Sequence, residues 1–391
     1  MKILQVGTGF ASMPPAGAYG TERTIHCLSA AMTALGHDVT VIDIEEKNRP
    51  PIPYQVVEVP LRWRKDVNLP THILRGFAFR QASRQGLRTL LQKEHFDIIN
   101  FNNQFSASHI SLARSHTIPV VYSLHNALWY NVWACRSSWQ RLKFFQDIRA
   151  MKTADIVICL NKTTSFNLTR YFSIAPIKIA VTPNGINEKW LVEREVPEDL
   201  RNRYAPNNEY VILHVGRIAP YKNQLTLVFA IPPVIKEIPK VRFLFIGPVT
   251  DKHYYHRLQS AITGLGVDNY VSFLGEIPYD ELPHFYSLCT VFVCPSSSEA
   301  MPTVILEAMA QSKAIVTSDI EPFSDALPRG VGTTVPTFDH QTLAHVISNM
   351  IKDASLREKM GQRAKEHVRR NYTWDNVAKR TAQVYEDVLK W

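Results

Sequence analysis

The chain has 391 residues, 45% of them hydrophobic and 20% charged, which is typical of a soluble globular protein with room for two full domains. The first residues, MKILQVG, lack the apolar core of a signal peptide, and no run of about 18 apolar residues predicts a membrane span. The five cysteines lack C-x-x-C spacing, so we expect reduced thiols, a cytoplasmic protein and no metal site.

The positive charge is concentrated in the first half of the chain. Residues 1–185 contain 21 Lys and Arg against 11 Asp and Glu, whereas residues 186–391 contain 23 against 24. This asymmetry predicts that the first half meets an acidic surface. We expect no nucleic-acid partner, because the sequence contains no recognised nucleic-acid module.

Short apolar runs alternate with helical patterns along the first half, after a strand at 2–7 and a helix at 21–35. Further strands are predicted at 38–44, 96–101, 119–124, 154–160 and 177–182, which indicates a parallel sheet. The polar, acidic composition of 187–208 predicts a linker. The strand pattern then restarts at 210–215, 241–247, 270–275, 290–294 and 314–317. The fold class is therefore α/β, with two Rossmann-like doubly wound domains (1–186 and 187–370) facing across a cleft and an amphipathic C-terminal helix within 371–391.

Two carboxylates flank a very apolar predicted helix in TVFVCPSSSEAMPTVILEAMAQSKAIVTSD (290–319). Glu299 precedes the helix in a serine-rich turn, Pro302 suits its first position, and Glu307 is the only charge between Ala300 and Ser312. A helix N-terminus at the carboxyl end of a strand attracts anions and is where open α/β sheets bind ligands. The alternative is structural, with Glu307 in a core ion pair and Glu299 as a cap.

Cations follow the first strand of the second domain in HVGRIAPYKN (214–223). Arg217 and Lys222 are five residues apart, and a guanidinium with an ammonium suits a diphosphate. The alternative is two solvated surface charges. In the first domain, SLHNA places His125 just after a strand, where it is either structural or functional. The loop GTGFASMPPAGAYGTER (7–23) contains glycines that let the backbone approach a phosphate.

PSSSEAMPTVILEAMA resembles the Glu, seven residues, Glu signature of the family-four retaining glycosyltransferases, and HVGRIAPYKN resembles the family's phosphate-binding element. The resemblance extends over essentially the whole chain and implies the GT-B fold, with the C-terminal helix crossing back to the first domain. The sequence departs from the family pattern at four positions: Ala300, Ser312, Asn223 and Tyr19 each stand where the family usually has glycine.

The resemblance also implies roles for particular residues. Glu299 and His125 contact the transferred sugar, and Glu307 holds the ribose. The donor diphosphate meets Arg217, Lys222, the glycine loop at Gly20 and backbone groups of Met301, Thr303 and Val304. The base lies near Gly247, Pro248 and Ile277. The reaction implied is metal-independent transfer of a sugar from a UDP- or GDP-sugar to a hydroxyl acceptor, such as a lipid-linked one or a growing glycan, with no cofactor.

Three other functions fit parts of the sequence. A non-hydrolysing sugar-nucleotide epimerase shares the architecture, and a non-catalytic sugar-nucleotide binder shares the pocket. Gly7-Thr8-Gly9 with Asp43 could be a dinucleotide fingerprint, but Ser12 stands at the third glycine.

Two basic stretches of the first domain predict either a solvated helix face or contact with an anionic membrane. One is the cluster of basic residues within 61–93. In the other, aromatic and basic residues alternate: Trp133, Trp139, Phe144 and Phe145 beside Arg136, Arg141 and Lys143.

Overall fold

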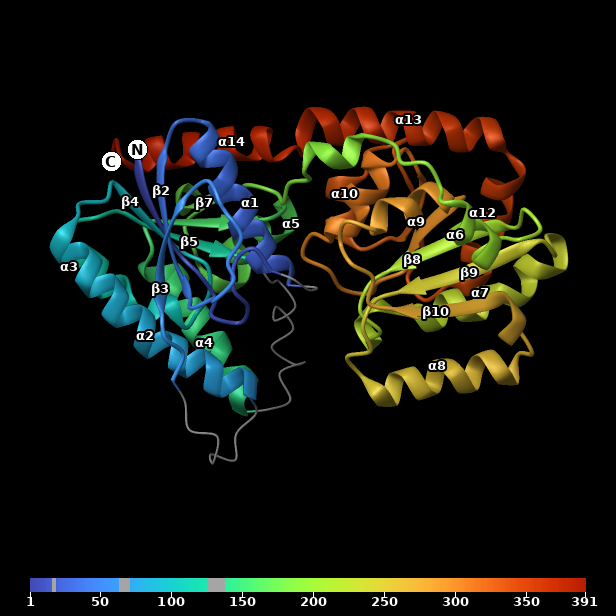
Figure 1. The fold of residues 1–391 in the computed structure, drawn as a ribbon, viewed down its shortest axis with the longest axis horizontal. Coiled ribbons are helices and arrows are strands. Elements are labelled where there is room, and N and C mark those ends of the chain that lie inside the picture. The colour runs from blue at the N-terminus through green and yellow to red at the C-terminus, as the bar shows by residue number, and fades with distance from the viewer. Residues whose placement is uncertain (16–18, 63–70, 126–137) are drawn as a thin grey trace. The chain divides into compact units, whose positions relative to one another are not determined.

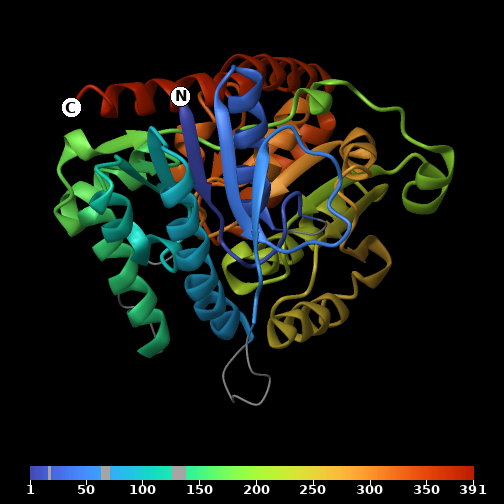
Figure 2. The same cartoon turned by 60° about the vertical axis from the view of Figure 1, so that its left-hand side comes forward.

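The computed structural model describes the chain except for residues 16–18, 63–70 and 126–137. The chain divides into two compact units (Figure 1). Unit 1 comprises Met1–Gly185 together with Trp374–Trp391, and unit 2 comprises Ile186–Thr373. The C-terminal helix α14 (Trp374–Val388) therefore packs in the same unit as the N-terminus, and both chain ends lie on that unit (Figure 2). The predicted return of the last helix to the first domain is confirmed.

Unit 1 contains a seven-stranded parallel sheet in the order β3-β2-β1-β4-β5-β6-β7. The order reverses direction between β1 and β4, which is the kind of switch point where doubly wound sheets bind ligands. The strands are β1 (Lys2–Val6), β2 (Asp38–Ile44), β3 (Gln55–Val59), β4 (Ile98–Phe101), β5 (Val120–Leu124), β6 (Ile156–Cys159) and β7 (Ile179–Val181).

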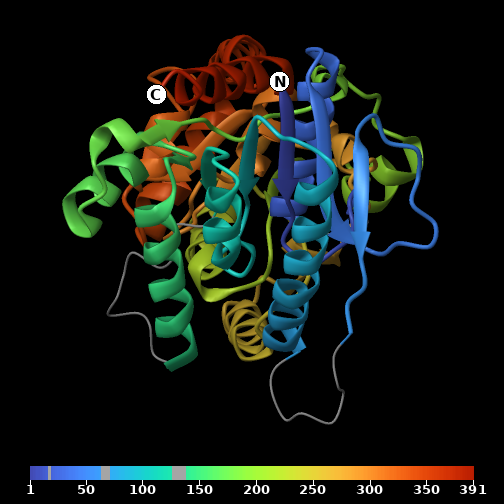
Figure 3. The same cartoon turned by 90° about the vertical axis from the view of Figure 1, so that its left-hand side faces the viewer.

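Helices cover both faces of the unit 1 sheet. On one face, α1 (Gly20–Ala34) and α14 pack against alternate side chains such as Ile3. On the other, Leu4 and its neighbours pack against α2 (Thr71–Lys93), α3 (Ile110–Ser115), α4 (Ser138–Thr153) and α5 (Lys162–Phe172); Figure 3 shows α2 and α4 over this face. A strand buried on both faces needs apolar residues at successive positions, which explains the continuous apolar runs.

Unit 2 repeats this plan with a six-stranded parallel sheet in the order β10-β9-β8-β11-β12-β13. Its switch point lies between β8 and β11. The strands are β8 (Tyr210–Val215), β9 (Val241–Ile246), β10 (Val271–Gly275), β11 (Val291–Cys294), β12 (Ala314–Ser318) and β13 (Thr333–Val335). The helices are α6 (Glu198–Tyr204), α7 (Gln224–Glu237), α8 (Lys252–Gly264), α9 (Leu282–Leu288), α10 (Thr303–Ala310), α11 (Glu321–Ala326), α12 (His340–Lys352) and α13 (Ala354–Asn371).

Three local expectations differ from the structure. The stretch 187–208 is no linker, because it contains α6 and because Trp190 is buried against Tyr279 and Tyr286, with ring centres 5.1 and 5.6 Å apart. Strands β3 and β13 were not predicted. Helix α10 begins at Thr303, so Pro302 caps the helix from outside instead of occupying its first turn.

Among the described helices, none combines the length and the apolar character needed to cross a bilayer. Four cysteines of the described chain, Cys27, Cys159, Cys289 and Cys294, are free thiols.

Candidate active site

At the switch point of unit 2, the loops that follow β8 and β11 are bonded to each other. The backbone N–H of Ser297 donates to the carbonyl of Tyr221 at 2.8 Å, and the Asn223 side chain donates to the carbonyl of Pro295 at 3.0 Å. Lys222 Nζ lies 2.6 Å from Glu299 Oε1. The fold therefore brings the predicted phosphate-binding cation and the predicted sugar-binding carboxylate into one ion pair.

This ion pair is nearly buried, with 11% of the Lys222 side chain and 10% of the Glu299 side chain exposed. Burial by itself lowers the pKa of Lys222, but the nearby Glu299 carboxylate outweighs it, so the pKa of Lys222 is raised above its ordinary value. Lys222 is thus a fixed positive charge. An ammonium group has three N–H donors, so it can keep Glu299 and still bind a phosphate oxygen.

The loop from β8 to α7 owes its shape to two amide side chains. Asn223 adopts the left-handed conformation (φ 53°), which asparagine tolerates better than most residues. Gln224 Nε2 donates to the carbonyl of Arg217 at 2.8 Å. Arg217 itself is exposed at the start of this loop. The loop therefore offers one nearly buried and one solvent-facing cation on a fixed backbone.

The residues predicted to meet the base border this loop. Pro248 accepts a hydrogen bond from the backbone N–H of Ile218 at 2.9 Å. Gly247 has φ 139°, and a Cβ placed there would lie 2.2 Å from the carbonyl oxygen of Gly216, so only glycine fits this close approach. Ile277 is partly exposed shortly after β10. Gly247, Pro248 and the cationic loop thus form one continuous edge of the sheet.

Glu307 is buried in α10, with 2% of the residue exposed. Its Oε2 accepts a hydrogen bond from the Tyr286 hydroxyl at 2.8 Å, and that hydroxyl also lies 3.3 Å from the carbonyl of Val304. Burial, together with the Glu307 charge, raises the pKa of Tyr286 well above its ordinary value, so the phenol stays a donor. Tyr286 therefore fixes the position of the Glu307 carboxylate.

The start of α10 offers backbone N–H groups without a side-chain cap. The N-cap residue is Pro302, which has no polar side chain, and the helix proper begins at Thr303 and Val304. The N–H groups of a first helical turn lack partners within the helix and attract anions. Met301 precedes this turn, and its residue is 8% exposed.

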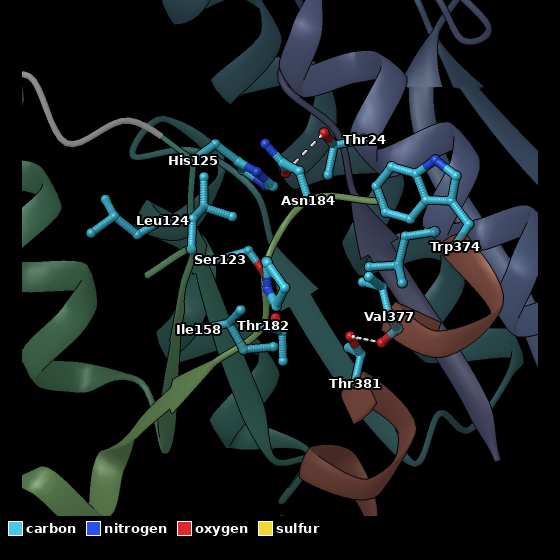
Figure 4. Close-up of a pocket in the computed structure, with 13 residues that line it drawn as sticks. Thr24, Ser123, Leu124, His125, Ile158, Thr182, Asn184, Trp374, Val377 and Thr381 are labelled. Carbon is cyan, nitrogen blue, oxygen red and sulfur yellow. Dashed lines mark hydrogen bonds between the residues drawn. The ribbon is translucent and has the colours of Figure 1, made fainter. Parts of the chain in front are cut away.

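In unit 1, His125 directly follows β5 and is partly buried. Its Nε2 lies 2.9 Å from Asn102 Oδ1, and burial lowers the pKa of His125 to about 4, so the ring is neutral near pH 7. His125 lines a cavity of about 20 Å³, large enough for one water molecule, together with Thr24, Thr182 and Asn184 (Figure 4). Thr24 Oγ1 donates to Asn184 Oδ1 at 3.3 Å.

The glycine loop of unit 1 gives a mixed result. Gly20 is the exposed first residue of α1, and a Cβ there would meet open space, so the packing of the described residues does not itself require glycine. Asp43, the acid of the dinucleotide alternative, has a fully buried side chain that accepts from the Met13 N–H at 2.7 Å and from Arg49 at 2.8 Å. Both bonds go to Oδ2, and the side chain is closed off from solvent, so in this structure it is not accessible to the ribose of a nicotinamide nucleotide.

Sequence reasoning missed the partners of these side chains. Tyr286 lies in an apolar helix and gave no signal. Asn102 did give one, since the sequence IINFNN sets polar residues at the end of a buried strand. No group of three or more His, Cys, Asp or Glu suited to a metal occurs among the described residues.

Two family models match the chain. One, described as "Glycosyl transferases group 1", matches residues 196–367, and the other, "Glycosyltransferase Family 4", matches residues 18–190. Among curated relatives, the phosphatidylinositol N-acetylglucosaminyltransferase GPI3 subunit of Saccharomyces cerevisiae is 24% identical over 381 residues, covering 94% of this chain and 80% of the relative.

Solved structures agree in fold over the full length. Sucrose-phosphate synthase from Thermosynechococcus elongatus superposes with a TM-score of 0.81 at 21% identity, covering 100% of both chains. HepE from Anabaena, solved in complex with UDP-glucose, gives a TM-score of 0.74 at 20% identity, covering 99% of this chain and 100% of HepE.

Two Rossmann-like units with these strand orders, matched to these structures, show that the chain has the GT-B fold. One family model matches each unit and both describe glycosyltransferases, so the chain belongs to the glycosyltransferases that these two models describe. The predicted fold class and family are confirmed.

Proposed function

We propose that the protein is a metal-independent, retaining hexosyltransferase that moves a sugar from a UDP- or GDP-sugar to a hydroxyl acceptor. The observation that carries the proposal is the Lys222–Glu299 ion pair, which spans the two loops at the unit 2 switch point. A cation for the leaving diphosphate and a carboxylate for the sugar stand next to each other there. The complex of HepE with UDP-glucose supports a uridine nucleotide as donor.

In this proposal the nucleoside diphosphate leaves as an anion. Arg217 and Lys222 bind it, and the backbone N–H groups of Met301, Thr303 and Val304 and the loop at Gly20 add donors. Positive charge and preorganised N–H donors stabilise the charge that develops on the leaving group, so no acid needs to protonate it. Glu307, held by Tyr286, accepts from the ribose hydroxyls, and the base lies against Gly247, Pro248 and Ile277.

Retention follows if the acceptor oxygen forms its bond to the anomeric carbon on the face from which the diphosphate departs. The bond from that carbon to the phosphate oxygen breaks, and the departing phosphate oxygen takes the proton of the acceptor hydroxyl. Glu299 and His125 contact the sugar and hold its reacting carbon in place. Proton, leaving group and new bond are then accounted for without a metal.

The matching family models describe glycosyltransferases, so they lend no support to the epimerase alternative. An epimerase would convert a sugar nucleotide with no acceptor present, whereas a non-catalytic binder would bind donor and convert nothing.

Contact with an anionic membrane is part of the proposal. Arg80, Arg84 and Arg88 are exposed at four-residue spacing along α2, whereas Phe79 and Leu87 face the core. A row of cations on one helix face suits anionic headgroups. The name of the yeast relative describes transfer to phosphatidylinositol, which agrees with a lipid acceptor. Trp133 and Arg136 lie outside the described residues, as do the side chains of Trp139, Arg141 and Lys143.

A two-stage experiment tests the function. Thermal shift with UDP-, GDP- and ADP-sugars identifies the donor, since a ligand of the native state raises its stability. Transfer of that sugar to candidate acceptors is then followed by NMR of the anomeric proton. We expect the donor's anomeric configuration in the product and loss of transfer, but not of nucleotide binding, in Glu299→Ala. An inverted product, or full transfer by this variant, would contradict the mechanism.

A further inference from the structure

A buried chain of hydrogen bonds connects the C-terminal helix to His125. Tyr385 of α14 is completely buried, and its hydroxyl oxygen accepts from Gln5 Nε2 at 3.3 Å and Asn100 Nδ2 at 3.0 Å. Gln5 and Asn100 are direct neighbours on β1 and β4, the two strands at the unit 1 switch point. Helix α14 therefore places the Tyr385 hydroxyl against the two adjacent strands at the middle of this sheet.

From Gln5 the series of hydrogen bonds continues to Asn102, just past the end of β4. Asn102 Nδ2 donates to Gln5 Oε1 at 3.0 Å and to the carbonyl of Val6 at 3.2 Å, and Asn102 Oδ1 lies 2.9 Å from His125 Nε2. A second branch runs from Ser123 Oγ to Asn100 Oδ1 at 3.0 Å. All of these side chains belong to unit 1.

The chemistry of the donors and acceptors fixes the direction of the bonds at Asn102 and His125. The Val6 carbonyl can only accept, so the amide nitrogen of Asn102 must face it and the amide oxygen must face His125. An amide oxygen can only accept, so His125 Nε2 must carry a proton. In the neutral ring the lone pair is then on Nδ1. The low pKa of His125 keeps the ring in this neutral form near pH 7.

We infer that Asn102, held by Gln5 and Tyr385, is a positioning residue that keeps the His125 proton on Nε2 and so makes Nδ1 a hydrogen-bond acceptor for the bound ligand. This rests on the proposed function only where it concerns the ligand. The ligand atom that meets Nδ1 must then be a donor, such as a sugar hydroxyl. A sugar that presents a carboxylate or a bare C–H at this point should be a poor substrate.

The tautomer can be measured without any substrate. In protein labelled with ¹⁵N-histidine, protonated and unprotonated ring nitrogens of neutral imidazole give well-separated ¹⁵N shifts, and the signals missing from His125→Gln are those of His125. We expect wild-type His125 at pH 7 to show a protonated Nε2 and an unprotonated Nδ1. The opposite tautomer, or a mixture, in the wild-type protein would overturn the inference.

Variants separate positioning from packing. Asn102→Leu should convert the single tautomer into a mixture, whereas Asn102→Asp, which keeps an acceptor facing Nε2, should retain the Nε2 proton. Tyr385→Phe should broaden or shift the His125 signals, because it removes the shared acceptor of Gln5 and Asn100. Thr381→Val is the matched control, since Thr381 is also buried on α14 and lines the His125 cavity, but among the described residues its hydroxyl donates to the carbonyl of Val377 in its own helix and not to the Tyr385 network. Unchanged His125 signals in both Asn102→Leu and Tyr385→Phe would refute the positioning role.

Kinetics provide a second reading once a donor is known. We expect Asn102→Leu to lower kcat about tenfold, the value of one hydrogen bond of about 1.4 kcal/mol. Asn102→Asp should recover part of kcat, and Thr381→Val should behave like wild type. If the tautomer is as inferred but no sugar nucleotide is ever turned over, the proposed function fails while the inference about His125 stands.

Discussion

The Lys222–Glu299 ion pair leads to an asymmetric prediction for nucleotide binding. The two charges are 2.6 Å apart and only about a tenth of each side chain is exposed, so each is the main partner of the other. Lys222→Met removes a cation that we propose binds the diphosphate. Glu299→Gln does the opposite, because it leaves a nearly buried ammonium without its counter-charge and therefore favours any anion that approaches.

The expected sizes follow from the value of a charged hydrogen bond, about 1.5–3 kcal/mol. Lys222→Met should weaken binding of a nucleoside diphosphate by about ten- to 150-fold. Glu299→Gln should bind within about threefold of wild type, or more tightly, although it loses transfer. Both variants should lose stability, since breaking a buried pair leaves one group unpaired.

Isothermal titration with UDP and with GDP measures these affinities, after circular dichroism has shown that each variant is folded. Lys236→Met is the control, because Lys236 is an exposed lysine on α7 of the same unit, and its affinity should equal that of the wild type. The reasoning is refuted if Glu299→Gln weakens nucleotide binding as much as Lys222→Met does.

Four further predictions concern stability, metal and membrane. Gly247→Ala should destabilise the protein by about 2–5 kcal/mol in chemical denaturation, because its Cβ would strike the Gly216 carbonyl. Gly264→Ala is the control, since a Cβ there meets open space, and it should be neutral or stabilising. Equal destabilisation by the two variants would contradict the packing. Burial lowers the pKa values of three histidines from 6.5 to about 4: His109, His125 and His214. Between these two pH values the unfolded state therefore binds more protons than the folded state. These histidines should have their full stabilising effect above pH 6.5, and the free energy of unfolding should fall as the pH is lowered from 6.5 to about 4. His214→Gln should make this fall less steep. Dialysis against EDTA should leave transfer unchanged; loss that Mg²⁺ or Mn²⁺ restores would disprove metal independence. Flotation with liposomes should increase with anionic lipid and drop in the Arg80→Glu/Arg84→Glu/Arg88→Glu variant, and equal flotation on neutral liposomes would argue against the membrane proposal.

The sequence predicted the strands well where burial on both faces enforces continuous apolar runs. The ranges 38–44 and 210–215 coincide with β2 and β8. It failed where a strand is short or half-exposed, as in β13 with three residues and in β3 at the sheet edge. It also failed at 187–208, where a single aromatic residue, Trp190, anchors a polar segment that composition alone describes as a linker.

The candidate site shows the same limit. Motif residues such as Lys222, Glu299 and Glu307 could be named from the sequence, because each motif is contiguous. Their partners could not be, because the ion pair joins residues 77 positions apart, and Tyr286 reaches Glu307 from a separate short helix that contains no recognisable motif. Long-range pairing of this kind is a property of the packed sheet and leaves no local pattern.

At two of the four positions that depart from glycine, the structure shows the backbone conformation that glycine favours. Asn223 and Ser312 both adopt positive φ, 53° and 55°, the conformation in which glycine is otherwise favoured. Asparagine occupies this region at modest cost, whereas Ser312 has no such advantage.

A crystal structure with bound UDP, or with the nucleotide that thermal shift selects, tests the central claim most directly. The account predicts a diphosphate held by Arg217, Lys222 and the start of α10, with the ribose on Glu307. A nucleotide bound elsewhere, with the Lys222–Glu299 ion pair untouched and Arg217 facing solvent, would contradict it.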